Sequence, residues 1–483
     1  RSYQVAEIEG AVTSINFGTD GWRGVIGRDY TFSNVEVVSQ AIADYVKSQR
    51  LPSRELLVGY DTRFLANQFA LRVAEVLAGN GFQVGLMDRP FPTPYVSYEV
   101  KRRSLAGGVM VTASHNPPEF GGIKFKAPFG GSATPAIVRQ IEGLLFLKPV
   151  QRLLEGRTQK PAAITQVSPG SEYFDHIKSL IRFDAIKRAS LKVVADSMHG
   201  TANGLLPQIL KDHGIDCIAI REKADPLFGG VFPEPMEENL GALRSSIFEN
   251  RADLGLATDG DADRLGVMDA LGNYVNTHQI LALLILHLVR NRHWTGEVVK
   301  TFSQSVLVER ICQKLSLQYR VVPIGFKNIA DLMLKEDVLV GGEESGGIGI
   351  KNHIPERDGI LINLLMLEAV AQSGRSLREM VLEVWREFGE FHFERRDLHI
   401  PFKVGQSLVQ RLKEKPPKEF AGLPLMRVDT LDGSKLVFQD ESWILFRQSG
   451  TEPLLRVYCE AGTHEKVNQL MEEGNRLADN ESF

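Results

Sequence analysis

Three carboxylates at alternate positions of the segment TDGDADR are the strongest sign of chemistry in this sequence: Asp259, Asp261 and Asp263. They follow an apolar run, Leu254–Thr258, that is typical of a buried strand. In extended backbone a spacing of two turns these side chains to one side, where they repel one another unless a cation lies between them. Oxygen ligands favour Mg²⁺ or Ca²⁺, and an EF-hand is excluded because Arg264 and Ala270 stand where it needs Gly and Glu. We therefore predict a divalent metal site; the alternative is an Asp-rich surface turn.

A serine in the segment TASHNP is a second candidate, because it follows the apolar run Gly107–Ala113. Ligand-binding residues of α/β proteins lie at such strand ends. Ser114 has His115 beside it and Lys124 further along the chain. A serine nucleophile needs a proton acceptor or a metal, and a phosphoryl group in transfer needs cations around it. His115 and Lys124 can supply these functions, but this segment alone supports a simple Ser or Asx turn equally well.

The glycine-rich segment GGEESGG follows another short apolar run. Its glycines allow the backbone to approach a ligand closely. Glu343 and Ser345 offer acceptors and donors that suit sugar hydroxyls, and neighbouring loops add Lys327, His353 and Arg357. The alternative is a flexible glycine turn.

The segment RQSGTEP joins two β-like runs and has the composition of a phosphate-binding nest. Arg447, Ser449 and Thr451 can donate to phosphate oxygens, together with backbone N–H groups around Gly450. Arg23 lies in a further glycine-flanked segment, FGTDGWRG. A hairpin loop without a binding role is the alternative for RQSGTEP.

The elements that must position these segments alternate between strand and helix. Leu56–Tyr60, Ala66–Ala78 and Phe82–Met87 have the spacing of strand, helix and strand, and this pattern restarts twice later in the chain. Such alternation predicts parallel sheets covered by helices on both faces. The run Leu147–Ser168 has no clear period and predicts a linker. From about Arg396, short strands and a final helix predict a smaller α+β domain.

We therefore predict an α/β protein of three similar domains with mixed or parallel sheets, plus a smaller C-terminal α+β domain. The predicted domains are I (1–165, serine loop), II (166–276, metal loop), III (277–395, GGEESGG) and IV (396–483, RQSGTEP).

The composition narrows the class of partner. The chain has 483 residues and a net charge of −4, which gives no electrostatic reason to expect nucleic acid or an anionic membrane. Its cysteines, Cys217, Cys312 and Cys459, fit neither a disulfide framework nor a zinc site. The apolar stretch Ile280–Val289 is too short to span a bilayer, and no signal peptide is visible. We expect a cytoplasmic protein without nucleic-acid or membrane partners.

Taken in order, the four segments resemble the α-D-phosphohexomutase family, which includes phosphoglucomutases and phosphomannomutases. The resemblance spans essentially the whole chain, and the segments GYDTRF, FPEPMEENL and LLRVY also fit it. It implies a heart-shaped enzyme of four domains around one central cleft. It further implies an intramolecular phosphotransferase that acts on hexose phosphates as a monomer or homodimer.

The resemblance assigns a role to each candidate. The catalytic residues would be Ser114 as phosphoryl carrier, His115, Lys124 and Arg23. One Mg²⁺ would be held by Ser114, Asp259, Asp261 and Asp263. The substrate would be bound by Lys327, Glu343, Ser345, His353, Arg357, Arg447, Ser449, Gly450 and Thr451.

One departure bears on the substrate. Mannose-type and glucosamine-type members carry a histidine at the position of Gly347, so this chain favours glucose phosphates, with mannose phosphates as an additional possibility. The missing histidine leaves one acid–base group unassigned, and His353 or Lys327 are the alternatives.

The implied reaction interconverts glucose 1-phosphate and glucose 6-phosphate, with glucose 1,6-bisphosphate as intermediate and activator. A glucose 1,6-bisphosphate synthase that uses fructose 1,6-bisphosphate or 1,3-bisphosphoglycerate as donor would need the same scaffold. A metal-dependent phosphatase and a non-catalytic sugar-phosphate sensor are further alternatives.

Overall fold

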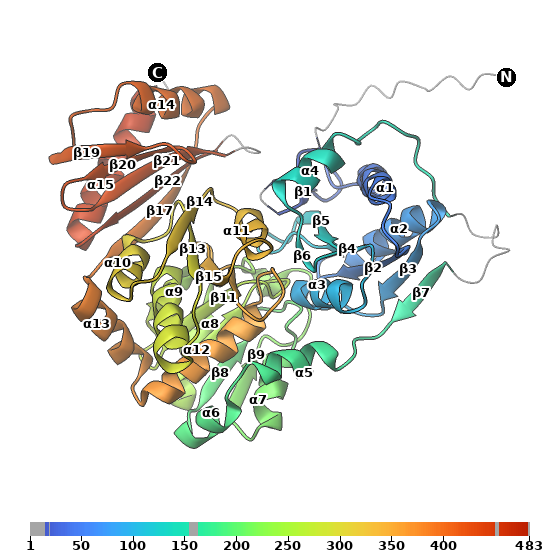
Figure 1. Ribbon diagram of the computed structural model, residues 1–483, viewed down its shortest axis with the longest axis horizontal. Helices are drawn as coiled ribbons and strands as arrows, with labels where there is room; N and C mark the ends of the chain where they lie inside the picture. Colours follow the sequence, from blue (N-terminus) through green and yellow to red (C-terminus); the bar gives the residue numbers. More distant parts are fainter. Residues whose placement is uncertain (1–14, 19, 154–162, 450–453, 482–483) are drawn as a thin grey trace.

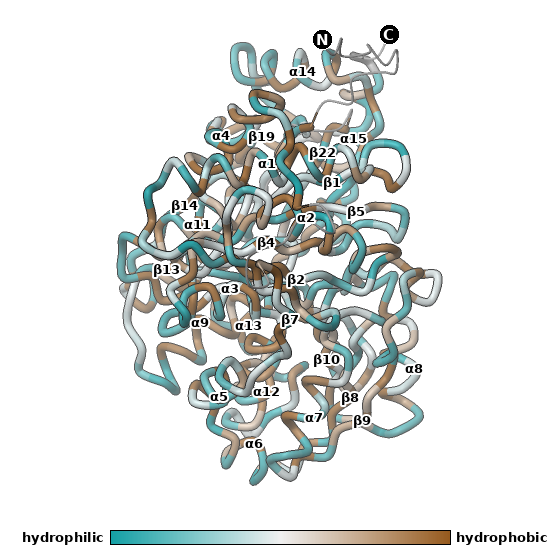
Figure 2. Tube along the Cα trace, turned by 90° about the vertical axis from the view of Figure 1, so that its right-hand side faces the viewer, coloured by the Kyte–Doolittle hydropathy of each residue, from teal (hydrophilic) through white to brown (hydrophobic). Residues whose placement is uncertain are grey.

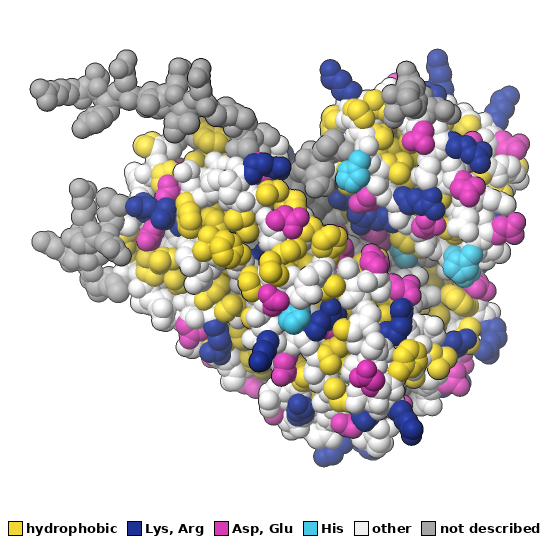
Figure 3. Space-filling model, turned by 180° about the vertical axis from the view of Figure 1, so that it is seen from behind, with side chains coloured by type: hydrophobic (Ala, Val, Ile, Leu, Met, Phe, Trp, Pro, Cys, Tyr) yellow, Lys and Arg dark blue, Asp and Glu magenta, His cyan; other side chains and the backbone are white. Residues whose placement is uncertain are grey.

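Four β-sheets divide the chain into four domains that form a heart-shaped molecule (Figure 1). The computed structural model describes residues 15–18, 20–153, 163–449 and 454–481. Hydrophobic segments lie along the interior strands, and hydrophilic segments lie in the outer loops and turns (Figure 2). Seen from behind, the surface is hollowed between domains I and IV (Figure 3).

Domain I is built on a sheet with strand order β1-β5-β4-β2-β3-β7, to which β6 adds beside β5. β4, β2, β3 and β7 run parallel, whereas β5 is antiparallel to β4 and β1. The elements are β1 (Trp22–Val25), α1 (Phe32–Ser48), β2 (Glu55–Tyr60), α2 (Ala66–Gly79), β3 (Gln83–Met87), α3 (Thr93–Arg102), β4 (Gly107–Val111), β5 (Phe120–Ala127), β6 (Gly131–Ser132), α4 (Pro135–Glu142) and β7 (Ile164–Val167).

Domain II has the strand order β12-β11-β10-β8-β9, with β10, β8 and β9 parallel and β11 antiparallel to β10. The elements are α5 (Glu172–Ser179), α6 (Phe183–Ala189), β8 (Val193–Asp196), α7 (Leu205–Asp212), β9 (Cys217–Ile220), the 3₁₀ turns η1 (Phe228–Gly230) and η2 (Glu237–Asn239), α8 (Gly241–Asn250), β10 (Leu254–Thr258), β11 (Leu265–Asp269) and β12 (Tyr274–Val275).

Domain III has the order β14-β13-β15-β16, with β16 antiparallel to β15. Its first helix is almost entirely apolar, as the run Ile280–Val289 predicts, and ends in a π-helical turn. The elements are α9 (Thr277–Leu286), η3 (His287–Asn291), β13 (Glu297–Thr301), α10 (Val306–Lys314), β14 (Tyr319–Val322), α11 (Phe326–Met333), β15 (Val338–Gly342), β16 (Ile348–Ile350), α12 (Gly359–Ser373) and α13 (Leu377–Phe388).

Domain IV is a sheet of order β17-β22-β21-β20-β19-β18. Its strands pair antiparallel, and α14 and α15 both pack on it. The elements are β17 (His392–His399), α14 (Phe402–Glu414), β18 (Glu419–Phe420), β19 (Leu423–Asp429), β20 (Ser434–Phe438), β21 (Trp443–Gln448), β22 (Leu454–Ala461) and α15 (His464–Glu481).

Two predicted boundaries fall inside strands. β7 pairs with β3 of the first sheet, so domain I extends through Val167 rather than ending at residue 165. β17 pairs along its whole length with β22, so domain IV starts at His392 rather than at residue 396. The predicted linker therefore contains a strand. β7 is a partly exposed edge strand of four residues, too short for its pattern to be recognised.

The first three domains share one structural plan that is not visible as a sequence repeat. In each, the chain leaves a parallel strand, forms a loop and returns as an antiparallel neighbour: β4 to β5, β10 to β11 and β15 to β16. These loops are TASHNP, TDGDADR and GGEESGG. The three predicted functional segments thus occupy equivalent places in three domains.

Candidate active site

The loops of domains I and II meet at the Ser114 hydroxyl. Ser114 is fully buried, and its Oγ donates to Asp259 Oδ2 over 2.9 Å. Its backbone is in the left-handed region, with φ +53°, which is uncommon for serine. A buried hydroxyl on a strained turn beside a carboxylate has the geometry expected of a nucleophile.

Arg63 holds the serine loop in this conformation. Its guanidinium donates to the backbone oxygens of Ser114 (2.7 Å) and Asn116 (2.6 Å), and to those of Pro117 and Phe120. Its Nε donates to Asp61 Oδ2 over 3.0 Å, and Asp61 also accepts from the Thr112 hydroxyl. Arg63 thus fixes the backbone from Ser114 to Phe120, and its partner Asp61 contacts Thr112 on the preceding side.

The acidic loop forms a site suited to a divalent cation. One carboxylate oxygen from each of Asp259, Asp261 and Asp263 lies within 4.8 Å of the others, and all three residues are buried. Within the described part of the chain, Asp261 Oδ1 and Asp263 Oδ1 are buried without a hydrogen-bond partner. Orphaned carboxylate oxygens of this kind match the oxygen ligands of hard cations, so the residues present fit a metal ion.

Mutual repulsion is visible in the pKa values of this loop. Burial raises the pKa of Asp259 well above its ordinary value, and the neighbouring Asp263 and Asp261 raise it further. Burial opposes ionisation of Asp261 too, but Lys124 and the Thr93 hydroxyl hold the pKa of Asp261 below its ordinary value. Thr93 opens helix α3 and donates to Asp261 through both its hydroxyl and its backbone N–H.

Lys124 links domain I to the acidic loop. Its Nζ donates to Asp261 Oδ2 at 2.8 Å and to Asp263 Oδ2 at 2.7 Å, and it lies 3.1 Å from Asp20. Although burial lowers the pKa of Lys124, Asp20 and the two loop carboxylates hold it above its ordinary value. Lys124 is therefore a buried cation fixed against two carboxylates of the acidic loop.

Domain III contributes Arg357, whose side chain contacts residues of domains I, II and III. Its guanidinium pairs with Asp20 of domain I, with Asp263 of domain II at 2.7 Å and with Glu343 of its own domain at 3.5 Å. Burial raises the pKa of Glu343 to about 7, and Arg357 opposes this shift. A Cβ added at Gly347 would lie only 2.3 Å from Arg357 Cδ, so Arg357 occupies the space that a side chain there would need.

Arg23 of β1 contacts the serine loop, in which His115 follows Ser114. Arg23 donates to Asn116 Oδ1 over 2.7 Å, and burial together with nearby Arg264 lowers the pKa of Arg23 to about 10. Burial and the cations Arg264 and Arg23 hold the pKa of His115 well below its ordinary value. Glu234 pairs with Arg264 at 3.1 Å and lies 3.9 Å from His115 Nε2.

The last predicted segment, RQSGTEP of domain IV, is described as far as Ser449. Arg447 is the last residue but one of β21 and forms an ion pair with Asp432 at 3.0 Å, while the Ser449 backbone N–H donates to Leu454 O. Gly450 and Thr451 lie outside the described residues.

Two other predicted substrate-binding residues contact groups outside the serine and acidic loops. The ring nitrogens of His353 contact His176 and Asp358, each at 3.0 Å. Lys327 Nζ donates to the backbone oxygen of Gly18 at 3.3 Å. Ser345 lies partly buried in its predicted loop.

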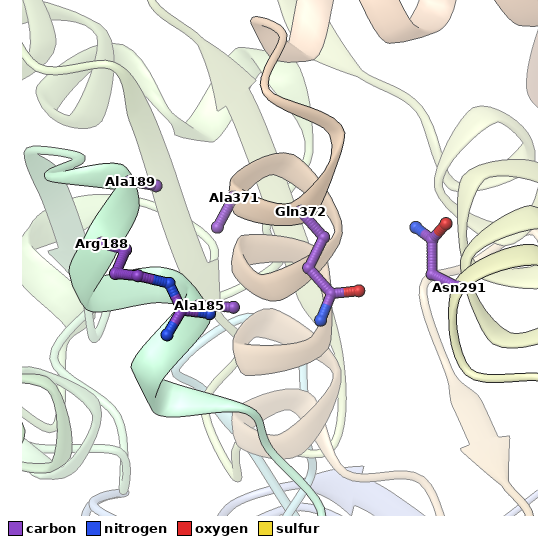
Figure 4. Close-up of a pocket in the computed structure, with 6 residues that line it drawn as sticks. All are labelled: Ala185, Arg188, Ala189, Asn291, Ala371 and Gln372. Atoms are coloured by element: carbon purple, nitrogen blue, oxygen red, sulfur yellow. The ribbon is translucent and has the colours of Figure 1, made fainter.

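A surface cavity of about 520 Å³ lies elsewhere, between α6, α12 and the end of η3 (Figure 4). Its lining consists of Ala185, Arg188, Ala189, Asn291, Ala371 and Gln372. These residues include no carboxylate, thiol or hydroxyl, so the chemistry belongs to the interdomain loops rather than to this cavity.

Comparison with known proteins agrees with this geometry. Family models described as phosphoglucomutase/phosphomannomutase α/β/α domains I, II and III match residues 14–148, 171–272 and 276–388, and the model of the C-terminal domain matches 408–476. The chain belongs to the phosphoglucomutase/phosphomannomutase family. It is therefore a phosphohexomutase, an intramolecular phosphotransferase.

Relatives of the mutase have several names. A phosphoglucomutase/phosphomannomutase of Thermococcus kodakarensis is 28% identical, over 95% of this chain and 98% of its own. A phosphoglucosamine mutase of Caldicellulosiruptor saccharolyticus is 27% identical, over 94% and 96%. The crystal structure of a phosphomannomutase-like protein from Thermus thermophilus superposes with a TM-score of 0.83 at 36% identity, covering 96% and 99% of the two chains. None of the mutase's described helices is long and apolar enough to cross a membrane.

Several residues of the mutase site were missed by sequence reasoning. Asp20, Arg63 and Arg264 stand inside segments that resemble the family, FGTDGWRG, GYDTRF and TDGDADR, so a signal existed without an assigned role. Thr93 had no such signal, because its partner Asp261 belongs to another domain.

Proposed function

We propose that this mutase interconverts glucose 1-phosphate and glucose 6-phosphate through a phosphorylated Ser114 and a glucose 1,6-bisphosphate intermediate. The observation that carries the proposal is the 2.9 Å contact between Ser114 Oγ and Asp259, within a buried cluster of three aspartates and beside a protonated Lys124. A serine surrounded in this way suits phosphoryl transfer, which depends on positioning and charge neutralisation.

In the first half-reaction, the bond between the phosphoryl phosphorus and Ser114 Oγ breaks and a bond to the free hydroxyl oxygen of the hexose phosphate forms. The proton of that hydroxyl leaves, and Ser114 Oγ ends protonated. Lys124 neutralises the charge of the transferred group, since its aspartate partners keep it charged. A bound Mg²⁺ held by Asp259, Asp261, Asp263 and the Ser114 oxygen would neutralise more of that charge.

In the second half-reaction the bisphosphate presents its other phosphate to Ser114 after turning in the cleft. Arg447 and Ser449 of domain IV hold the phosphate that does not react. Glu343 reads a sugar hydroxyl and, with a pKa raised by burial to about 7, can exchange its proton near neutral pH. Arg357 keeps Glu343 in place at 3.5 Å.

Glucose is the proposed main substrate because Gly347 stands where the mannose-type and glucosamine-type members carry a histidine. The space around Gly347 gives a physical reason why a histidine does not fit at this position. A side chain at position 347 would clash with Arg357 Cδ and, at 2.9 Å, crowd Glu343 Oε2. Arg357 is therefore the cationic side chain in the space beside Gly347 and Glu343.

The test is the product spectrum of the Mg²⁺-loaded enzyme with glucose 1-phosphate, mannose 1-phosphate and glucosamine 1-phosphate. We expect the highest kcat/KM for glucose 1-phosphate with catalytic amounts of glucose 1,6-bisphosphate, and no turnover by Ser114→Ala. Preference for another sugar would refute the substrate. Stoichiometric release of bisphosphate in the presence of fructose 1,6-bisphosphate or 1,3-bisphosphoglycerate would show a synthase, and release of inorganic phosphate would show a phosphatase.

A further inference from the structure

The turn between β19 and β20 carries a carboxylate that faces the predicted phosphate-binding loop. This turn, residues 430–433, packs tightly against β21: Gly433 has φ +111°, and a Cβ there would lie 2.5 Å from Phe446 O. The tight fit holds the preceding Asp432 against the end of β21. Asp432 Oδ1 lies 3.0 Å from Arg447 Nε.

The second oxygen of the same carboxylate reaches another domain. Asp432 Oδ2 accepts the backbone N–H of Ile324, in domain III, over 2.8 Å. Ile324 and Gly325 lead directly into α11, whose Lys327 is a predicted substrate-binding residue. One carboxylate thus joins the guanidinium of Arg447 to the segment that leads into the helix carrying Lys327.

The surroundings make this bridge more than a surface ion pair. Around it, Phe302 and Ile324 of domain III pack against Val437, Trp443 and Leu445 of domain IV. The Arg447 and Asp432 side chains are 13% and 22% exposed. Arg427 and Asp429 form a comparable pair on the same hairpin, but their side chains are 50% and 37% exposed. Screening by water is weaker for the less exposed pair.

The geometry also suits the chemistry of phosphate binding. An arginine whose Nε faces a carboxylate still has two Nη groups that can donate to phosphate oxygens. The ion pair restricts the guanidinium to the side of Asp432, so less rotamer entropy is lost when it binds an anion. The carboxylate therefore orients Arg447 without taking over its donors.

We propose that Asp432 is a positioning residue that orients Arg447 toward the non-reacting phosphate and fixes this orientation relative to domain III. The inference rests on the proposed function, in which Arg447 binds that phosphate. Since the non-reacting phosphate is bound in both the ground state and the transition state, loss of orientation weakens binding more than it slows the chemical step.

The experiment measures KM and kcat for glucose 1-phosphate in the Mg²⁺-loaded enzyme, with catalytic glucose 1,6-bisphosphate. The variants are Asp432→Asn, Arg447→Ala, the double variant, and Asp429→Asn as the matched control. We expect Asp432→Asn to raise KM about tenfold with kcat within about threefold, because it removes a charge-assisted contact. Asp429→Asn leaves both constants unchanged. In the Arg447→Ala background, Asp432→Asn has no further effect on KM.

Asp432→Glu keeps the charge on a longer side chain and gives an intermediate KM, which preserves the test if Asp432→Asn does not fold. An unchanged KM in Asp432→Asn, while Arg447→Ala raises KM, would overturn the inference alone. So would an equal rise of KM in the Arg447→Ala background. If Arg447→Ala itself leaves KM unchanged, the phosphate-binding role in the proposed function fails, and the inference fails with it.

Discussion

Arg63→Met should separate the two tasks of the buried pair that Arg63 forms with Asp61. The native guanidinium donates to four backbone oxygens of the serine loop and to Asp61, and the two side chains are 2% and 0% exposed. Methionine fills much of the space but donates nothing. The variant therefore frees the backbone around Ser114 and leaves a buried carboxylate without its counter-charge.

The magnitude follows from these losses. Removing one partner of a buried ion pair costs about 3–5 kcal/mol, which corresponds to a fall in Tm of about 10 °C for a domain of this size. Misplacement of a nucleophile by about 1 Å costs about 100-fold in kcat/KM. Arg28→Met is the control, because Arg28 pairs with Asp29 on the surface of the same domain and should shift neither quantity.

The double variant Asp61→Asn/Arg63→Met is the decisive measurement. It removes the unpaired carboxylate, so at least half of the lost Tm should return, whereas kcat/KM should stay low because the serine loop is still unsupported. Burial raises the pKa of Asp61. Its protonated form is therefore favoured in the folded state, and the stability cost of Arg63→Met should grow as pH rises from the ordinary carboxyl pKa and level off above the raised pKa. Equal Tm values for the single and double variants would refute the reasoning, as would full activity of Arg63→Met.

Three further predictions concern the site itself. Burial raises the pKa of Glu343 to about 7, so kcat/KM should increase as pH rises through about 7. Glu343→Gln should flatten this part of the pH profile. An unchanged profile in that variant would contradict a role for ionised Glu343 in the reaction. Removal of metal with a chelator should abolish turnover and lower the Tm, because the three aspartates of the acidic loop then repel one another. Added Mg²⁺ should restore both. Turnover by the metal-free enzyme would count against a metal site at these aspartates. Gly347→His should lower kcat/KM at least tenfold because its Cβ meets Arg357 Cδ at 2.3 Å, and Gly347→His/Arg357→Ala should relieve the clash as measured by Tm.

Local signals in the sequence were sufficient for the strands that lead into the functional loops. The run Leu254–Thr258 is β10 residue for residue, and Gly107–Ala113 contains β4. Apolar strands followed by loops of Asp, Ser and Gly are recognisable because period and composition change within a few residues. The spacing of the aspartates predicts a metal site, and the structure places the three carboxylates in one buried cluster that could hold a metal ion.

Contacts between domains left no such local signal. Thr93 and Asp261 are 168 residues apart, and no periodicity connects them. His353 was assigned to the substrate as part of the segment HIPERDG and as an alternative for the histidine missing at position 347, and in the structure its ring contacts His176 of α5. Side chains four residues apart in a loop can face different domains, and only the three-dimensional arrangement decides which.

The charges of the acidic loop in domain II are neutralised by cations from other domains, so the site depends on how the domains assemble. Domain II brings together the three aspartates, and the cation of the same loop, Arg264, pairs with Glu234 at 3.1 Å. Lys124 comes from domain I and Arg357 from domain III, and both contact Asp263 at 2.7 Å. Asp20 of domain I in turn pairs with both cations. Because Asp263 takes both of these cations from other domains, separating the domains would leave this buried carboxylate without its counter-charges, so the acidic loop is also a junction that holds the first three domains together.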